Sequence, residues 1–167
     1  MQSAQVWYLR KELYGNSAIS NLFTIEYKLQ SHIDSQDYLQ FYHQIGKPWK
    51  WAERLILDQK KLDYILQNPL NEIYYIFENQ ERIGYFEIDF NQQEPELQYF
   101  GIIPKHLGKG IGKQMMQAVF NIVLQRDQSS IFLHTCSNDS PAALPFYQKM
   151  GFIIYKEVTE NQKIIVY

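Results

Sequence analysis

Hydrophobic and polar residues follow two periods along this chain, and each change of period marks a new element of secondary structure. Residues 22–29 alternate in polarity as a strand does. After them, apolar positions recur with helical spacing as far as Gly46, which is suited to end a helix. Asp34 or Ser35 can cap its first turn, because a side-chain oxygen can accept from a free backbone N–H there. The predicted apolar face of this helix consists of Tyr38, Leu39, Tyr42 and Ile45.

The next part of the chain predicts a turn, a short helix and several strands. The turn covers residues 46–51 and the helix covers 58–67. The helix stops at Asn68-Pro69, since a residue before proline disfavours helical backbone angles. Strands are expected at residues 72–78, 82–90 and 97–103. Short pairs of turn-forming residues separate them, so we expect antiparallel hairpins.

A long apolar stripe with helical spacing begins after Gly110 and consists of Ile111, Met115, Ala118, Val119, Ile122 and Val123. A strand over 130–137 follows this third helix. Ser140 and Pro141 then start a fourth helix that Gly151 ends, and strands at 152–158 and 163–167 complete the pattern. The strand, helix and strand within 97–137 predict a parallel crossover. The expected fold is therefore mixed α/β (α+β), with a mostly antiparallel central sheet flanked by helices on both faces.

Composition narrows the setting of this fold. The 167 residues, 46% of them hydrophobic, fit a single domain over residues 1–167. No apolar run reaches the roughly 18 residues of a membrane span, so no membrane partner is expected. A formal net charge of −2 without a block of Lys and Arg argues against a nucleic-acid partner. The N-terminus carries no secretory signal and the single Cys136 cannot form an internal disulfide, which together favour a cytoplasmic location.

Three glycines stand just before the third helix, at Gly108, Gly110 and Gly112. Glycine admits backbone angles that side chains forbid, and N–H groups converge at a helix start, where the dipole favours an anion. The turn predicts a phosphate site; a tight turn packed on the sheet is the alternative. A P-loop would need Gly and Ser or Thr where the chain has Leu107 and Gln114. A dinucleotide fingerprint would need Gly where it has Lys113, so both motifs are excluded.

A second segment runs from Asn138 to Phe152, presents Tyr147 and ends its helix at a glycine. One segment can hold a phosphate and the other a proton donor, which suggests an enzyme with a phosphorylated cofactor. The spelling of both resembles the GNAT superfamily of acyl-CoA-dependent N-acyltransferases. Its two motifs are matched by Ile102-Ile-Pro104 with Leu107-Gly-Lys-Gly-Ile-Gly112, and by Ser140-Pro-Ala-Ala-Leu-Pro-Phe-Tyr-Gln-Lys-Met-Gly-Phe152. The predicted elements follow the family's order, so the resemblance covers nearly the whole chain.

Three residues depart from the family pattern. Leu107 replaces the usual Gln or Arg, so one side-chain contact to the cofactor phosphates is missing. Ser140 replaces the usual Asn, for which Asn138 is a candidate substitute. Pro145 lies in the first turns of the last helix, where it removes one N–H and is expected to distort the helix. These departures concern cofactor details and leave Tyr147 in place.

The resemblance implies acetyl-CoA as cosubstrate. Its pantetheine arm is expected between two splayed strands, 97–103 and 130–137, and its pyrophosphate on the backbone N–H groups of the glycine turn. Gly101 independently indicates a bulge or a close backbone approach in the first of these strands. The implied cofactor-binding residues are Phe100, Ile102, Leu107, Gly108, Lys109, Gly110, Ile111, Gly112, Lys113, Asn138 and Tyr147.

Acetyl transfer to an amine requires a base for the ammonium and an acid for the thiolate. The family motif places Tyr147 to protonate the thiolate; an ordinary core tyrosine is the alternative. The resemblance favours Glu96 as the base, with Glu87 on the neighbouring strand as the competitor, and either can be only a solvated strand residue. His134 and Cys136 share a strand face near the expected acyl site, but a structural role is more typical of each. The histidines show no metal-ligand spacing, so no metal is expected.

The acceptor side is less well specified. Trp49 and Trp51 lie between the first two helices, which border the acceptor pocket in the resembling family; capping the core is the alternative role. Asp and Glu dispersed along the chain favour a small amine, or one amine of a peptide, over a polyamine. The main hypothesis is an N-acetyltransferase that moves acetyl from acetyl-CoA to a primary amine by direct attack in a ternary complex, as a monomer or a homodimer. A non-catalytic CoA-binding regulatory module and a nucleotide-binding protein are the alternatives.

Overall fold

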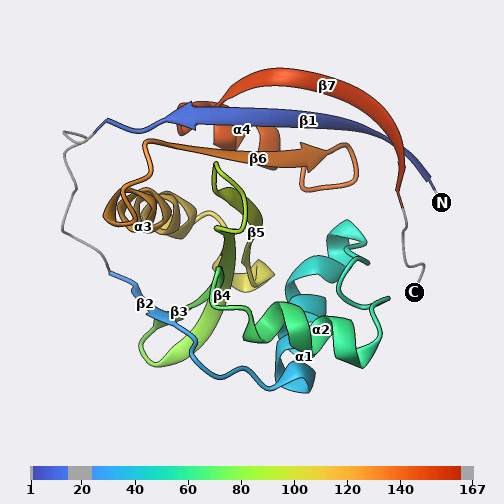
Figure 1. Cartoon of the computed structure of the whole chain (residues 1–167), viewed down its shortest axis with the longest axis vertical. Coiled ribbons are helices and arrows are strands. Elements are labelled where there is room, and N and C mark those ends of the chain that lie inside the picture. Colours follow the sequence, from blue (N-terminus) through green and yellow to red (C-terminus); the bar gives the residue numbers. More distant parts are fainter. Residues whose placement is uncertain (1, 15–23, 163–167) are drawn as a thin grey trace.

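The elements of the fold surround one sheet, and a computed structural model describes residues 2–14 and 24–162 of the chain (Figure 1). Its strands are β1 (Gln2–Glu12), β2 (Glu26–Leu29), β3 (Asn71–Glu78), β4 (Glu81–Asp89), β5 (Glu96–Ile102), β6 (Ser130–Cys136) and β7 (Ile153–Gln162). Its α-helices are α1 (Ser35–Gly46), α2 (Gln59–Gln67), α3 (Ile111–Gln125) and α4 (Ala143–Lys149). Two short 3₁₀ turns, η1 (Lys47–Trp49) and η2 (Pro104–His106), follow α1 and β5.

The sheet has the strand order β2-β3-β4-β5-β6-β1-β7. All neighbouring strands pair antiparallel except β5 and β6, which pair parallel. Because α3 connects β5 to β6, this pair is the crossover that the sequence predicts. The expected mixed α/β class is thus confirmed. The predicted bounds of the first two helices, the predicted start of the third and the predicted bounds of strands β3 to β6 lie within one residue of those observed.

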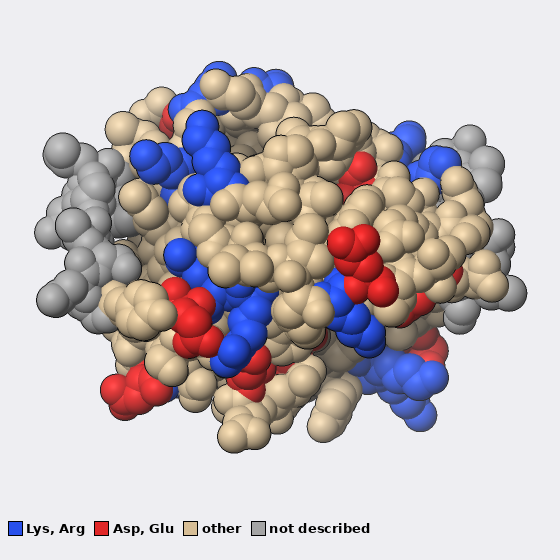
Figure 2. Space-filling model, turned by 90° about the horizontal axis from the view of Figure 1, so that it is seen from above, with Lys and Arg blue, Asp and Glu red and all other residues tan. Residues whose placement is uncertain are grey.

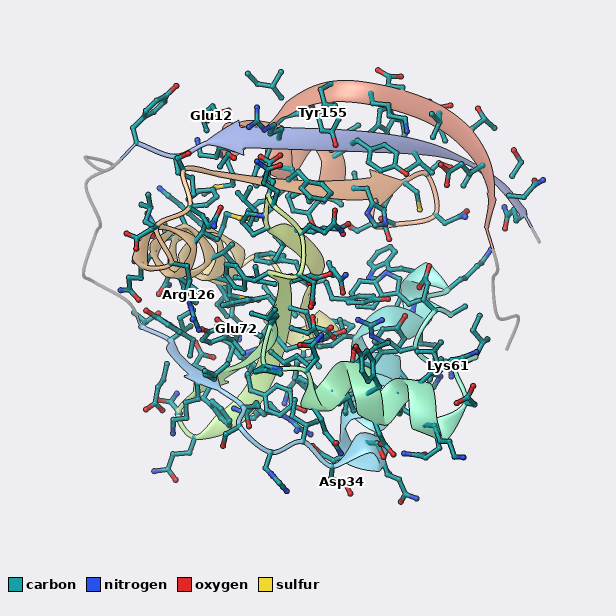
Figure 3. The ribbon with its side chains drawn as sticks, in the orientation of Figure 1. Glu12, Asp34, Lys61, Glu72, Arg126 and Tyr155 are labelled. Carbon is teal, nitrogen blue, oxygen red and sulfur yellow. The ribbon has the colours of Figure 1, made fainter. Side chains whose placement is uncertain are left out.

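Side-chain caps explain why α1 and α2 begin where they do. The Asp34 carboxylate accepts from the N–H of Asp37 at 2.8 Å, so Asp34 rather than Ser35 is the cap of α1. Figure 3 labels Asp34 at the start of this helix. The Asp58 carboxylate accepts from the N–H of Lys61 at 3.0 Å and caps α2 in the same way. Both caps satisfy backbone donors that have no partner inside the helix.

The sequence analysis assigned no element to the first twelve residues, yet β1 lies inside the sheet between β6 and β7. Its register against β7 shifts between Tyr8 and Leu9. The unpaired residue at this shift is Tyr155 of β7, and the register of β1 against β6 runs unbroken from Val6 to Glu12. Val6 and Leu9 are three positions apart and therefore point to opposite faces of the sheet, yet both are buried. Burial on both faces removes the strict alternation by which a strand is found in a sequence.

The C-terminal elements also differ from the prediction. Two strands were expected at 152–158 and 163–167, but β7 continues without a break to Gln162, and residues 163–167 lie outside the described part, as do 22 and 23 of the predicted first strand. The fourth helix begins at Ala143 instead of Ser140, although the Ser140 carbonyl accepts from the N–H of Ala143 at 2.8 Å. Pro145 is consequently the third residue of α4, ahead of the first helical donor, Phe146. The expected distortion is wrong, because the missing N–H would have had no helical partner.

The helices cover both faces of the sheet. A Cβ built on Gly101 in β5 would lie 2.3 Å from Cγ2 of Ile45, so α1 packs directly on the backbone of this strand. The next residue, Ile102, points to the opposite face, where its side chain lies near Gly112 of α3. Gly101 therefore marks a close approach, as predicted. The bulge in β5 falls elsewhere, at Gln98, between the pairs Glu87↔Tyr99 and Ile88↔Leu97.

Charged side chains join the layers and cover the surface. Figure 3 shows Arg126 beside Glu72, and the ion pair between them links the end of α3 to β3. Figure 2 looks onto the β7 side of the molecule and shows Lys and Arg in separate groups with Asp and Glu between them. None of the helices in the described ranges is both long and apolar enough to cross a membrane.

The sheet opens at its centre. The parallel strands β5 and β6 pair at Glu96↔Phe132, supported by a hydrogen bond from the N–H of Phe132 to the carbonyl of Pro95 at 3.1 Å. No further pair joins them in the described structure, so the two strands diverge towards their C-terminal ends. The expected splay is present. It leaves an opening between β5 and β6 that side chains from other elements surround.

Candidate active site

Two cavities meet at the opening between β5 and β6. Cavity A has a volume of about 310 Å³, and cavity B has a volume of about 460 Å³. Cavity A lies beside the N-terminal half of β5 and the end of β6, and cavity B lies beside the end of β5, the glycine turn and α4. The residues that line both are Trp49, Trp51, Phe100, Ser140, Ala143 and Tyr147.

The glycine turn forms one wall of cavity B. Gly108 and Gly110 have φ angles of 79° and 77°, in the left-handed region that favours glycine. A Cβ built on either residue would meet no protein atom within 4 Å, so the outer side of the turn is open to a ligand. The N-terminus of α3 has no side-chain cap. Its backbone donors and its dipole therefore suit an anionic group such as a pyrophosphate.

Lysines add positive charge to this wall. Lys113 and Lys149 both line cavity B. Lys109 belongs to the turn but does not line the cavity; its Nζ lies 3.5 Å from Nδ1 of His106. The sequence analysis did not select Lys149, although it is the lysine two residues after Tyr147 in the second motif. Leu107, in the place of the family's polar residue, is 53% exposed and offers only its backbone to a phosphate.

The backbone of β5 offers hydrogen-bonding groups to the opening. The N–H of Ile103 donates to the carbonyl of Ile83 at 2.9 Å, which points the backbone groups of Ile103 towards β4. Because successive residues of a strand alternate in this direction, the backbone groups of Ile102 and Phe100 point away from β4, into the opening. These are the residues at which the sequence analysis expected β-like bonds to the pantetheine arm.

Tyr147 lies where the two cavities meet. Its ring packs edge-on against Phe100, Phe146 and Phe152, which fix its position on α4. Within the described residues its hydroxyl has no hydrogen-bond partner. Burial, with a smaller contribution from Asp139, raises the pKa of Tyr147 well above 10. The phenol therefore keeps its proton through the neutral range and is available as a donor.

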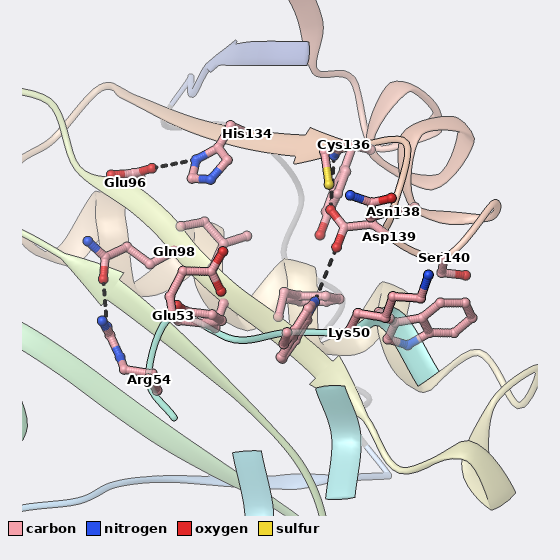
Figure 4. Close-up of a pocket in the computed structure, with 17 residues that line it drawn as sticks. Lys50, Glu53, Arg54, Glu96, Gln98, His134, Cys136, Asn138, Asp139 and Ser140 are labelled. Carbon is pink, nitrogen blue, oxygen red and sulfur yellow. Dashed lines mark hydrogen bonds and ion pairs between the residues drawn. The ribbon is translucent and has the colours of Figure 1, made fainter. Parts of the chain in front are cut away.

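Glu96 and His134 form a pair on the wall of cavity A (Figure 4). Nδ1 of His134 lies 2.9 Å from Oε1 of Glu96, and the imidazole is 45% exposed to the cavity while the carboxylate is 12% exposed. The hydrogen bond that Glu96 accepts from His134 raises the pKa of His134 above 6.5, although burial acts in the opposite direction. Tyr8 of β1 packs on the imidazole with ring centroids 5.7 Å apart. Glu96, the predicted base, therefore binds and stabilises the charged form of a histidine that lines the cavity.

Glu87 lies in a buried network outside both cavities. Its side chain is fully buried and accepts hydrogen bonds from Tyr38 and from Nη2 of Arg54, the latter at 2.9 Å. Arg54 in turn lies over the ring of Tyr99, 4.8 Å from its centroid, and donates to Gln98 at 3.1 Å. The geometry therefore assigns Glu87 to holding Arg54. Sequence reasoning missed Arg54, because the turn around it has no periodic pattern.

The tryptophans occupy the common wall of the two cavities. Trp51 packs against Tyr42 and Tyr99, and its indole N–H donates to Oδ1 of Asp139 at 3.1 Å (Figure 4). Oδ2 of Asp139 accepts from Thr135 and from the N–H of Cys136, which anchors this bridge to β6. Both tryptophans therefore border cavity B as well as cavity A, where the acceptor was expected.

Asn138 lines cavity A and Ser140 lines both cavities. Asn138 does not line cavity B, so its position does not support the idea that it takes the place of the family's asparagine at the cofactor. Carboxylates that are dispersed in the sequence gather in space, since Glu53, Glu96 and Asp139 all line cavity A together with Lys50 and Arg54. At this cavity the acidic residues are therefore not dispersed, as they are along the sequence.

The described ranges contain no group of three or more His, Cys, Asp or Glu side chains that could hold a metal ion.

The arrangement supplies the parts that an acyl transfer needs. Cavity B offers backbone donors, lysines and an open strand edge to a long phosphorylated molecule. Cavity A offers an imidazole with a raised pKa to an amine. Tyr147 lies between them as a phenol without an internal partner. A base and an acid therefore stand on the two sides of one opening.

Comparisons with known proteins concern the fold and the family of this chain. Solved structures with similar folds include a conserved protein of unknown function from Staphylococcus epidermidis, with a TM-score of 0.73 and 17% identity over 93% of this chain and 60% of that chain. A GNAT family structure from Novosphingobium aromaticivorans has a TM-score of 0.64 and 12% identity over 95% of this chain and 63% of that chain. A GNAT family acetyltransferase from Elizabethkingia anophelis with acetyl-CoA bound has a TM-score of 0.61 and 21% identity over 80% and 78% of the two chains.

These likenesses concern the fold, and the chain spans less than two thirds of the length of the first two structures. No curated protein matches the sequence at a significant level. The sequence model of the acetyltransferase (GNAT) family matches residues 32–152, which include the glycine turn, Glu96, His134 and Tyr147. This match covers more than half of the 167 residues. The chain therefore belongs to the GNAT family of acetyltransferases.

Proposed function

We propose that this protein is an N-acetyltransferase that moves acetyl from acetyl-CoA to a primary amine of a small molecule or a peptide. The observation that carries the proposal is the meeting of cavities A and B at Tyr147 and Phe100, beside the open edge of β5. A phosphorylated donor held in cavity B can extend along this edge to the place where an amine in cavity A would lie. The amine then attacks directly in a ternary complex, without an acyl-enzyme.

The chain's own residues divide the binding of acetyl-CoA. The N–H groups of the turn from Leu107 to Gly112 hold the pyrophosphate, with Lys113 and Lys149 adding charge. The backbone groups of Phe100 and Ile102 hold the pantetheine arm as an added strand would be held. When bound, acetyl-CoA supplies the thioester carbon that the amine attacks.

The proton steps belong to His134 and Tyr147. His134 takes a proton from the acceptor ammonium, and Glu96 stabilises the imidazolium that forms. The bond from the amine nitrogen to the acetyl carbon forms as the bond from that carbon to sulfur breaks. Tyr147 gives its proton to the departing thiolate, and the second proton that the nitrogen loses on becoming an amide restores the phenol through solvent. The proton that His134 took from the ammonium passes to solvent, so one proton is released for each acetyl group transferred. Such positioned acids and bases contribute roughly 10²- to 10⁴-fold each.

Thermal unfolding with added ligands tests the cofactor assignment. Acetyl-CoA at about 100 times its dissociation constant should stabilise the protein by about 2.7 kcal/mol, whereas ATP and NAD at the same concentration should not. Release of CoA in the presence of an amine panel then tests turnover. Binding of acetyl-CoA without release for any amine would instead support the non-catalytic regulatory module. Stabilisation by ATP or NAD alone would support a nucleotide-binding protein.

Two variants of Gly110 distinguish the backbone shape of the glycine turn from its accessibility to a phosphate. Gly110→Asn should retain the fold, because Asn tolerates a φ of 77°, yet its side chain would occupy the open side of the turn and weaken acetyl-CoA binding by about tenfold. Gly110→Val should also lower the free energy of unfolding by about 1–3 kcal/mol, because a β-branched residue is strained at positive φ. Calorimetric titration and thermal unfolding measure the two effects. Unchanged affinity in the folded Asn variant would make the turn purely structural.

A further inference from the structure

A third cavity adjoins the acceptor side of the site. Cavity C has a volume of about 300 Å³. It lies beside the end of α2, the first residue of β3 and the last residue of β4. Arg54 and Gln98 line both cavity A and cavity C, so these two hydrogen-bonded side chains form a common wall (Figure 4). The proton steps proposed above use none of the groups in cavity C. Its chemistry therefore concerns another part of a ligand.

The common wall contains an unused donor. Arg54 is only 8% exposed. Its Nε donates to the hydroxyl of Tyr38 at 3.2 Å, and its Nη2 donates to Glu87 and Gln98. Within the described residues its third nitrogen, Nη1, makes no hydrogen bond. A guanidinium that is buried and paired on two sides thus keeps the two N–H groups of Nη1 for a ligand.

The same wall contains an unused acceptor. Asn71 is 8% exposed and lines cavity C. Its amide nitrogen lies 3.4 Å from the carbonyl of Ile65 and 3.5 Å from Oε2 of Glu87, and both of these groups accept hydrogen bonds. The amide orientation is therefore fixed, because the reverse orientation would bring oxygen against oxygen. Oδ1 is left buried without a partner in the described structure. Arg54 and Asn71 contact the same oxygen of Glu87, so the side chains that carry the free donor and the free acceptor meet at this carboxylate.

The charges around the wall favour a neutral ligand group. Glu87 balances Arg54, and Asp89 adds a carboxylate to cavity C. Cavity A adds Glu53 and Asp139 against one lysine, Lys50. A carboxylate or phosphate on the acceptor would enter a region with surplus negative charge, whereas the acceptor's ammonium is attracted to it. A neutral hydroxyl can accept from Nη1 of Arg54 and also donate to Oδ1 of Asn71.

The surroundings favour hydroxyl groups over a peptide backbone. An extended peptide binds by adding a strand to a free sheet edge. Here β4 pairs with β3 and with β5 as far as Asp89, so it has no free edge beside cavity C. The N–H of Asn71, at the start of β3, already donates to the carbonyl of Asn68 at 2.9 Å. Tyr64, 74% exposed, is one of the residues that line the cavity, and its ring provides a flat apolar face. Such a face suits the C–H surface of a hydroxylated carbon chain or ring.

We infer that cavity C is a subsite for a neutral, polyhydroxylated part of the amine acceptor. Arg54 and Asn71 bind one of its hydroxyl groups, and Tyr64 packs on its carbon skeleton, while the amine lies in cavity A beside His134. The acceptor class is therefore an amino sugar or an aminated polyol. This inference rests on the proposed function, which it deepens by naming the substrate class.

Two six-carbon primary amines test it by acetyl-CoA-dependent release of CoA: 1-amino-1-deoxyglucitol, which carries five hydroxyls, and hexylamine, which carries none. The wild-type protein should give a kcat/KM at least about 10-fold higher for the hydroxylated amine. Arg54→Lys keeps a positive charge opposite Glu87 but removes Nη1, and it should reduce this preference by about 10-fold. Using the ratio of the two amines cancels any general loss of activity in the variant.

Two tyrosine variants keep the test decisive if Arg54→Lys fails to fold. Tyr64→Ala should also reduce the preference, by about threefold, and its stability cost should be small because the ring is 74% exposed. Tyr14→Ala is the matched control, since Tyr14 is 73% exposed and lines none of the three cavities. Equal kcat/KM for the two amines, an unchanged preference in both cavity variants, or a stronger preference for the N-terminal amine of an unhydroxylated tripeptide would overturn the inference.

Failure of the proposed function would leave a different signature. If acetyl-CoA binds but no amine releases CoA, the binding of 1-amino-1-deoxyglucitol can be followed directly by ligand-observed NMR. Binding that is lost in Arg54→Lys or Tyr64→Ala and retained in Tyr14→Ala would support the subsite without turnover. Binding that is absent, or that none of these changes affects, would refute it.

Discussion

Replacing Tyr147 with Phe is expected to lower kcat by about 100-fold or more while the dissociation constant of acetyl-CoA changes little. The change keeps the ring that packs against Phe100 and Phe146 and removes only the hydroxyl. That hydroxyl has no partner among the described residues, so its loss leaves no internal group unpaired. The defect should therefore appear in chemistry and not in folding. Steady-state kinetics and calorimetric titration of acetyl-CoA on the same preparation measure the two quantities.

Tyr85→Phe is the matched control for this experiment. Tyr85 is 1% exposed, its hydroxyl is buried without a hydrogen bond in the described structure, and it lines none of the cavities. Removing that hydroxyl should leave kcat unchanged and should not lower the free energy of unfolding. If Tyr147→Phe retained full turnover while Tyr85→Phe behaved as expected, Tyr147 would be a packing residue and solvent would protonate the thiolate.

Removal of the imidazole by His134→Gln is expected to lower kcat by about 100-fold at pH 7. The loss should shrink as the pH approaches the pKa of the acceptor amine, about 10.4 for a lysine-like group, because the amine then arrives without its extra proton. A merely structural role of His134 would not produce this recovery. His32→Gln is the control, since His32 is exposed and lies outside the cavities.

Glu96→Gln tests whether Glu96 raises the pKa of His134. The Glu96 hydrogen bond raises the pKa of His134 above 6.5, so in the wild-type protein the imidazole stays protonated, and unable to act as a base, up to that raised value. Without the carboxylate, the largest cause of the raised pKa is removed, and burial, opposed only by the smaller effects of Asp139 and Glu53, lowers the pKa of His134. The acidic limb of the kcat/KM profile should therefore move to lower pH in Glu96→Gln, with a lower plateau because the base is weaker. An acidic limb that stays in place, or moves to higher pH, would remove the pair from the mechanism.

Several features of the fold could be read from local sequence because local physics decides them. The glycine turn before α3 was predicted because residues at positive φ are mostly glycine, and Gly108 and Gly110 do adopt such angles. The helical stripe after Gly110 and the short turns between β3, β4 and β5 were found for the same reason, since periodicity and turn chemistry act over a few residues. The family motifs added Tyr147, and the structure finds it between the two cavities.

Other features could not be read in this way because they depend on contacts between distant residues. The strand β1 escaped prediction because its place between β6 and β7 is stabilised by pairing across more than a hundred residues, and because burial on both of its faces hides the alternation. The partners of single polar residues were hidden as well. Glu87 was a candidate base in the sequence, but the buried guanidinium of Arg54 binds it away from both cavities.

The sequence by itself therefore determined the family, the glycine turn and the place of Tyr147 in the second motif, because each depends on a short run of residues with fixed spacing. Only the tertiary structure decided which partner each carboxylate has. It placed Glu96 against His134 across the parallel strand pair, gathered Glu53 and Asp139 around the same cavity, and left one nitrogen of Arg54 without a hydrogen bond among the described residues. The physical reason is that a charged or polar side chain takes its role from the partners that folding brings to it, and a strand's sequence does not specify the strand beside it.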